Sequence, residues 1–149
     1  MIEVINADIL TAKEDIIVHE VNCLGAMGAG LALHIKRKYP LSFKKYHDAC
    51  VANRPEDLLG KIQMLKMEDG KIICNMFSQL KYGKGAKHTD YEAMTICFDK
   101  IYRYAKLNGL TVAIPYNIGC GLGGGNWPIV LNIISKRFKD RSIVKIYKL

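Results

Sequence analysis

The sequence lacks the segments that a membrane or secreted protein needs. It contains no apolar run near the roughly 20 residues that a membrane-spanning helix requires. Its beginning does not combine a basic stretch with an apolar one, as a secretion signal would. We therefore expect a cytoplasmic protein with no membrane contact.

Paired cysteine motifs are also missing. The five cysteines are odd in number, scattered, and never spaced as CxxC. This pattern argues against both a disulfide framework and a zinc site. We expect no metal site and no cofactor, and we expect reduced, mostly buried thiols at Cys23, Cys50, Cys74, Cys97 and Cys120.

Length and charge set the next limits. A chain of 149 residues that is 50% hydrophobic predicts one domain, residues 1–149, with a sizeable core. The net charge of +8 fits an anionic partner, either nucleic acid or a phosphorylated small molecule. Because the lysines are spread along the chain, an ordinary solvated surface explains most of them, and the charge alone does not choose a partner.

Apolar patterning predicts strands that alternate with helices. A two-residue turn at Asp69–Gly70 predicts that two of the strands form an antiparallel hairpin. We expect an α/β fold: a three-layer α/β/α sandwich whose mixed sheet is parallel at its centre and antiparallel at its edges. The predicted strands are 2–6, 16–21, 62–67, 72–77, 110–116 and 142–147, and the predicted helices are 30–39, one after Pro40, 91–107 and 127–138.

Two glycine-rich connections each follow a buried strand and lead into a helix. They read NCLGAMGAGLALHI at 22–35 and NIGCGLGGGNW at 117–127, and Asn126 is the expected N-cap of the second helix. Backbone N–H groups that no side chain covers form an anion cradle beside a helix N-terminus, and two facing cradles would suit a diphosphate. The alternative is that the glycines serve only tight turns and close packing. Neither loop continues into the GK[ST] of a Walker P-loop.

Four segments, in order, resemble the macrodomain family: NADIL at 6–10, VNCLGAMGAGLA at 21–32, CNMFSQ at 74–79 and IPYNIGCGLGGGNW at 114–127. The chain is most similar to the branch of ADP-ribose 1″-phosphate phosphatases and terminal ADP-ribose protein glycohydrolases. The resemblance implies an ADP-ribose-binding domain that hydrolyses ADP-ribose 1″-phosphate or O-acyl-ADP-ribose. Three alternatives are a reader module without turnover, a de-ADP-ribosylating glycohydrolase and a basic nucleic-acid-binding protein. ADP-ribosylated protein or nucleic acid is the implied macromolecular partner.

The resemblance also implies ligand-binding residues. Asp8 would accept a hydrogen bond from the adenine amino group, Ile9 would offer backbone contact, and Tyr147 would lie beside adenine. Asn22 would contact the distal ribose. From the residues alone, a turn-capping Asp8, an Asx turn at Asn22 and a half-buried strand tyrosine at 147 remain alternatives. The rest of the implied set is Gly25, Ala26, Gly28, Ala29, Gly30 and Leu31 in the first loop, Ile118, Gly119, Cys120, Gly121, Leu122 and Gly123 in the second, and Gln79 and Tyr116.

The loop SQLKYGKGAKHTDY at 78–91 supplies the catalytic candidates. In the glycohydrolase a lysine of this loop attacks the distal ribose, and its counterpart here is either Lys81 or Lys84. An aspartate of the second glycine loop assists that lysine, but this chain has Gly123 and Asn126 at the two positions where relatives carry it.

Asparagine cannot accept a proton as a general base, so we expect glutamate-linked ADP-ribose to be a poor substrate. Hydrolysis of the 1″-phosphate or an acyl ester would instead use a water placed by Asn22, Gln79 or His88 against a charge that the cradles stabilise. A histidine titrates near neutral pH, which makes His88 a candidate, although a simple surface residue is the alternative.

Overall fold

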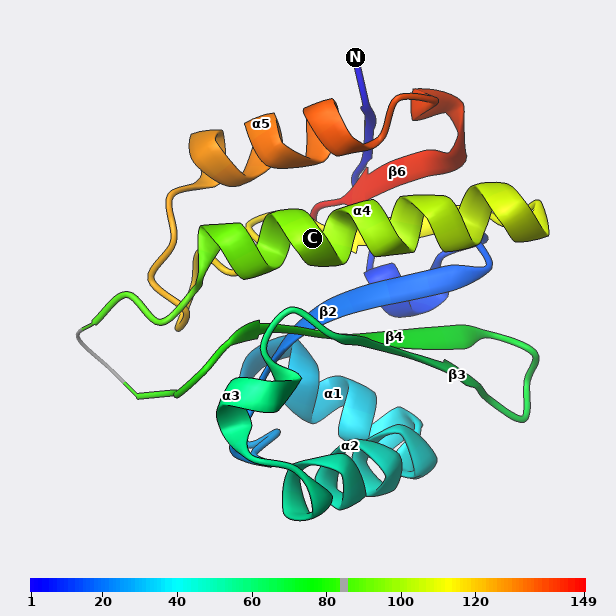
Figure 1. Ribbon diagram of the computed structural model, residues 1–149. Coiled ribbons are helices and arrows are strands. Elements are labelled where there is room, and N and C mark those ends of the chain that lie inside the picture. The colour runs from blue at the N-terminus through cyan, green and yellow to red at the C-terminus, as the bar shows by residue number, and fades with distance from the viewer. Residues whose placement is uncertain (84–85) are drawn as a thin grey trace.

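The computed structural model describes residues 1–83 and 86–149, and within these ranges six strands form one mixed sheet with the order β1-β6-β5-β2-β4-β3. Helices cover both faces of the sheet (Figure 1), which confirms the predicted three-layer α/β/α fold. The strands are β1 (Glu3–Ile5), β2 (Ile16–Asn22), β3 (Ile62–Lys66), β4 (Ile72–Gln79), β5 (Val112–Pro115) and β6 (Val144–Tyr147). The helices are α1 (Gly30–Lys38), α2 (Pro40–Ala52), α3 (Pro55–Leu58), α4 (Tyr91–Asn108) and α5 (Trp127–Arg137), with 3₁₀ turns η1 (Ile9–Thr11) and η2 (Arg141–Ile143).

The sheet is parallel except at one edge. β3 pairs antiparallel with β4 through the predicted hairpin, whose Gly70 has a φ of +89°. The prediction of antiparallel pairing at both edges was wrong, because β1 pairs parallel with β6. Only a tight turn between consecutive strands forces an antiparallel pair, and β1 and β6 are separated by most of the chain.

Alternate residues of the central strands supply separate cores on the two faces of the sheet. Ile16 and Val18 of β2 belong to the core beneath α4 and α5, where Phe98 is fully buried. Ile17 and Val21 belong to the cores on the opposite face, under α1 and α2. The near-continuous apolar pattern of β2 follows from this burial on both sides.

Helix boundaries follow local signals. α1 ends just before Pro40, and α4 ends at Gly109, which has a left-handed φ of +65°. Because Leu110 still donates its N–H to the carbonyl of Ala105, β5 begins two residues later than predicted. The short elements η1, α3 and η2 were not predicted, since helical periodicity needs more residues than they contain.

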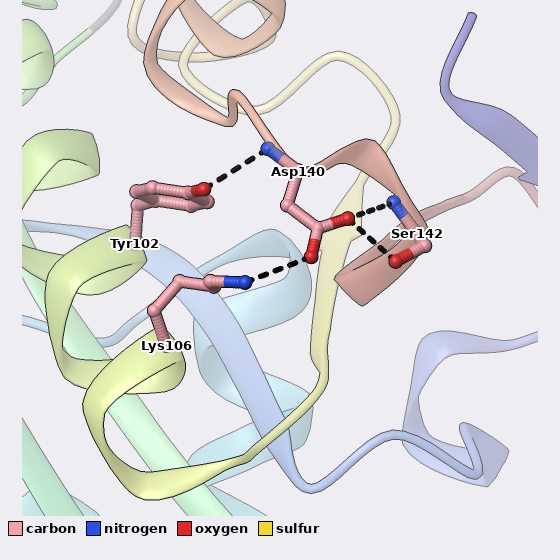
Figure 2. Close-up of polar contacts among 4 residues, drawn as sticks. All are labelled: Tyr102, Lys106, Asp140 and Ser142. Atoms are coloured by element: carbon pink, nitrogen blue, oxygen red, sulfur yellow. Dashed lines mark hydrogen bonds and ion pairs between the residues drawn. The ribbon is translucent and has the colours of Figure 1, made fainter.

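Asp140 joins α4 to the start of β6 (Figure 2). Its carboxylate accepts hydrogen bonds from the Ser142 N–H and hydroxyl at 3.1 and 2.6 Å, and from Lys106 Nζ at 3.0 Å. Its own N–H donates to the Tyr102 hydroxyl. The bonds from Ser142 and Lys106 lower the pKa of Asp140 to about 2. The residues 142–143 therefore form η2 rather than the first part of the predicted strand.

The cysteines are free and mostly buried, as predicted: Cys23, Cys74 and Cys97 are buried, and Cys50 and Cys120 are partly exposed. In the described part of the chain, no helix is both long and apolar enough to span a bilayer. The described residues also contain no cluster of three or more histidine, cysteine or acidic side chains that could hold a metal ion.

Candidate functional site

A cavity of about 520 Å³ lies where the two glycine-rich loops meet, beyond the carboxyl ends of β2, β4 and β5. Ligands in open α/β sheets bind at this edge. The cavity brings together these predicted residues: Asn22, Ala26, Gly28, Ala29, Gly30, Leu31, Gln79, Tyr116, Ile118, Gly119, Gly121, Leu122 and Gly123. Its lining does not include Asp8, Ile9, Gly25, Lys81, His88, Cys120 or Tyr147, and Lys84 lies outside the described residues.

The first loop is organised around Asn22 and Tyr46. Asn22 forms the Asx turn that sequence offered as an alternative: its Oδ1 accepts from the Leu24 N–H at 2.9 Å, and its Nδ2 donates to the Ala26 carbonyl at 2.8 Å. The fully buried Tyr46 hydroxyl donates to Asn22 and accepts the Gly25 N–H at 3.1 Å. Burial raises the pKa of this hydroxyl, so it stays protonated. Asn22 therefore shapes the loop that borders the cavity.

Helix α1 opens onto the cavity without a side-chain cap. Its N-cap is Ala29, which has no side chain that could accept from the first N–H groups, and the next residue, Gly30, has a φ of +58°. In α5, by contrast, the predicted N-cap is confirmed, because Asn126 Oδ1 accepts from the Ile129 N–H. The uncapped end of α1 leaves positively polarised N–H groups facing the cavity, which suits an anion.

The second loop is a compact turn held by its own backbone. Asn117, Gly119 and Gly124 have φ values of 64°, 72° and 73°, and the Gly125 N–H donates to the Gly119 carbonyl at 2.8 Å. At Gly121 an added Cβ would meet no atom within 4 Å. The loop therefore offers bare backbone to the cavity.

Glu20 is a cavity-lining acid that sequence analysis missed. It lies on β2 beneath the second loop, where an added Cβ on Gly123 would lie 2.8 Å from its Oε1 and one on Gly119 3.1 Å from its Oε2. Ser78 Oγ donates to Oε2 at 2.6 Å, and Thr89 Oγ1 lies 3.1 Å from Oε1. Burial is the main cause that raises the pKa of Glu20 to about 7, against the opposing effect of the hydrogen bond from the Ser78 hydroxyl. A signal was present, because Glu20 interrupts an apolar strand that is buried on both faces.

His19 is the other polar residue within β2. It is 2% exposed, and its Nε2 pairs with Asn75 Oδ1 at 2.6 Å on the face that carries α1 and α2. Burial lowers its pKa to about 4. His19 is therefore neutral at physiological pH.

None of the residues predicted around adenine lines the cavity, although Ile9 and Tyr147 pack in one cluster. Ile9 and Tyr147 are buried in one cluster against which the cavity-lining Leu31 packs. Asp8 is exposed and caps η1, with its Oδ1 accepting from the Leu10 N–H at 2.9 Å. Tyr147 is 6% exposed, so it is more buried than the half-buried alternative, and its hydroxyl donates to Glu14 at 2.5 Å.

The structure describes only part of the loop that carries the predicted catalytic residues. Gln79 is buried at the end of β4, opposite Asn22, and its Nε2 donates to the Lys81 carbonyl at 2.6 Å. Lys81 itself is exposed. The His88 backbone N–H donates to the Gly123 carbonyl at 2.7 Å, which ties this loop to the second glycine loop.

Sequence analysis missed further lining residues. They include Met27, Tyr82, Gly83 and Asn117. Tyr82 is 57% exposed. An isolated loop tyrosine carries no pattern in sequence, so only its place beside the cavity identifies it.

Comparison with known proteins gives the family. A family model described as Macro domain matches residues 18–134. The chain is 34% identical over 138 residues to the DNA ADP-ribosyl glycohydrolase of Mycobacterium tuberculosis (strain ATCC 25618 / H37Rv). The alignment covers 91% of this chain but only 38% of that protein. It is 37% identical over 168 residues to the ADP-ribose 1″-phosphate phosphatase of Debaryomyces hansenii. That alignment covers 91% of this chain and 93% of the relative.

A solved structure agrees with these relatives. The macrodomain of Mycobacterium tuberculosis DarG matches with a TM-score of 0.83 at 28% identity, over 99% of this chain and 96% of that one. The matched family model, the relatives and the shared fold lead to one conclusion: the chain belongs to the macrodomain family.

Proposed function

We propose that the protein binds ADP-ribose between its two glycine-rich loops and hydrolyses conjugates at the distal ribose, releasing ADP-ribose. The observation that carries the proposal is the pair of facing loops. The uncapped N-terminus of α1 borders one side of the cavity and the bare backbone at Gly121 borders the other. A diphosphate between them would accept hydrogen bonds from both loops.

The names of the relatives support hydrolysis at this position. One is a DNA ADP-ribosyl glycohydrolase and the other an ADP-ribose 1″-phosphate phosphatase. Their names share ADP-ribose and differ in the group attached to it. The net charge of +8 is compatible with a nucleic-acid conjugate but does not by itself choose between these groups. We therefore propose ADP-ribosylated DNA as a substrate class beside the 1″-phosphate.

The proposed orientation places the distal ribose beside Asn22 and Gln79 and the adenine toward Asp8, Ile9 and Tyr147. Leu31 supports this direction, since it lines the cavity and packs on the cluster that contains Ile9 and Tyr147. No cofactor enters the proposal, because water and the chain's own polar groups are sufficient for hydrolysis. The cytoplasm remains the expected location.

The loop lysines have a smaller part in this proposal. Lys81 is exposed and outside the cavity lining, so Lys81→Ala should reduce turnover only modestly by removing positive charge near an anionic substrate. A trapped covalent adduct with a lysine of the parent protein would contradict this and restore the nucleophilic route.

Calorimetric titration with ADP-ribose tests the binding site, with Gly121→Val as the variant that fills it. The added side chain meets no protein atom within 4 Å through its Cβ, so the fold should survive while binding is lost. Hydrolysis is then assayed on ADP-ribose 1″-phosphate and on an ADP-ribosylated oligonucleotide. Unchanged affinity in the folded variant would refute the site, and binding without turnover of either substrate would leave a reader module.

A further inference from the structure

Glu20 is the acidic residue among the cavity-lining residues of strand β2, so it lies on the sheet rather than on a loop. It lies two residues before Asn22 on β2, and Ser78 of β4 and Thr89 hold its carboxyl group in place. Both of these partners are buried. An acid held in this way has one fixed position relative to a ligand between the loops.

The hydrogen bonds of Thr89 indicate which protonation state of the Glu20 carboxyl group the site accommodates. Thr89 Oγ1 lies 2.6 Å from the Gly119 carbonyl oxygen and 3.1 Å from Glu20 Oε1. A hydroxyl has one hydrogen, and a carbonyl can only accept. When Thr89 donates to Gly119, its oxygen is left as an acceptor toward Glu20. The arrangement is then satisfied by a carboxyl that carries its own proton.

Within residues 1–83 and 86–149, no charged side chain is among the causes that set the pKa of Glu20. The charge of Glu20 affects the pKa values of two thiols, Cys97 on α4 and Cys120 in the second loop. Burial raises these pKa values to about 12 and about 11, so both thiols are neutral. Asp90 directs its carboxylate to the first turn of α4. His19 lies on the opposite face of the strand and is neutral.

The second glycine loop keeps this carboxyl group next to the cavity. A side chain at Gly123 would collide with Thr89 Oγ1 at 2.4 Å and with the Gly119 carbonyl at 2.8 Å, as well as with Glu20. Gly123 must therefore remain without a side chain. The carboxyl group of Glu20, on β2, occupies the space that such a side chain would fill. The second loop covers Glu20, but Glu20 still lines the cavity.

We propose that Glu20 is the catalytic proton donor for cleavage of the bond between C1″ of the distal ribose and its leaving group. This inference rests on the proposed binding of ADP-ribose conjugates. As the C1″ bond breaks, its electron pair goes to the leaving atom, which takes the proton of Glu20. Water then forms a bond to C1″ and gives a proton back to the Glu20 carboxylate. One water is consumed, and ADP-ribose and the protonated leaving group are released.

Glu20→Gln tests the proposal, because glutamine keeps the shape and hydrogen-bonding pattern of a protonated glutamate but has no acidic proton. Calorimetry should give an ADP-ribose dissociation constant within twofold of the parent value. Turnover of an ADP-ribosylated oligonucleotide should fall about 100-fold or more, in the range typical of a lost general acid. Glu68→Gln, in the exposed β3–β4 turn, is the matched control and should be unaffected.

Two further measurements separate proton donation from a structural role. ADP-ribose linked through C1″ to p-nitrophenol has a leaving group that needs no proton, so Glu20→Gln should cleave it at nearly the parent rate. The parent rate on the oligonucleotide should decrease tenfold per pH unit above about 7, as Glu20 loses its proton. This decrease in rate above about pH 7, the alkaline limb of the pH profile, should be absent from the Glu20→Gln variant.

The opposite results would overturn the proposal. They are a Glu20→Gln protein that turns over the oligonucleotide normally, a parent profile without a limb near pH 7, or equal losses on both leaving groups. A parent that binds ADP-ribose but cleaves nothing would remove the role of Glu20 and leave the binding site standing. A parent that does not bind ADP-ribose would refute the proposed function itself.

Discussion

Replacing Glu20 with glutamine should change the way in which stability depends on pH, whether or not a substrate is present. In the folded protein the pKa of Glu20 is raised from 4.5 to about 7, chiefly by burial. Between these two values the folded state binds more protons than the unfolded state. The free energy of unfolding contributed by Glu20 is therefore fully present below pH 4.5 and is lost as the pH rises through 7.

The size of the effect follows from the shift. Each unit of pKa difference corresponds to about 1.4 kcal/mol, so an increase from 4.5 to about 7 amounts to roughly 3 kcal/mol. Glutamine at position 20 cannot ionise. The difference in unfolding free energy, variant minus parent, should rise by roughly 3 kcal/mol between pH 4.5 and pH 8.

Urea unfolding at several pH values, followed by the fluorescence of the single tryptophan, Trp127, measures this difference. Taking the difference removes groups that both proteins share, including His19, whose depressed pKa makes the parent lose stability as the pH falls from 6.5 to about 4. Glu68→Gln, at an exposed position, should give a flat difference. A flat difference for Glu20→Gln would show that Glu20 ionises normally and would refute the account of a protonated carboxyl.

Four other substitutions test the loops and the adenine side. Gly123→Ala should destabilise the fold by several kcal/mol, because the added Cβ would lie 2.4 Å from Thr89 Oγ1. Gly121→Val should instead unfold at the parent's urea midpoint and lose only ADP-ribose binding. Tyr46→Phe removes the hydroxyl that bonds to Asn22 and Gly25. The ADP-ribose affinity measured by calorimetry should fall about tenfold, and the unfolding free energy should fall by about 1–3 kcal/mol. Unchanged affinity would show that the first loop keeps its shape without this hydroxyl. Asp8→Ala should weaken ADP-ribose binding by about 1.5–3 kcal/mol and leave binding of a base-free diphosphate unchanged, and equal binding of ADP-ribose would make Asp8 only the cap of η1.

Much of the architecture was predictable because its signals are local. The break before Pro40, the turn at Asp69–Gly70 and the cap at Asn126 each depend on a few neighbouring residues, and all three appear as predicted. The two glycine loops were predicted to face one another, since the carboxyl ends of parallel strands meet at one sheet edge. The cavity lies between them.

The proposed role of Glu20 depended on contacts between distant parts of the chain. Sequence alone indicated that the second loop lacked a carboxylate, because Gly123 and Asn126 occupy the expected positions. The tertiary structure brings Glu20 of β2 into contact with Thr89 and beneath Gly123, across separations of 69 residues and more. The ionisation of that carboxyl is set by burial, and burial exists only after the sheet, α4 and the second loop have packed together. Residue type and order thus indicated the two loops between which we propose that an anion binds, whereas only the packed fold placed Glu20 beside the cavity and raised its pKa.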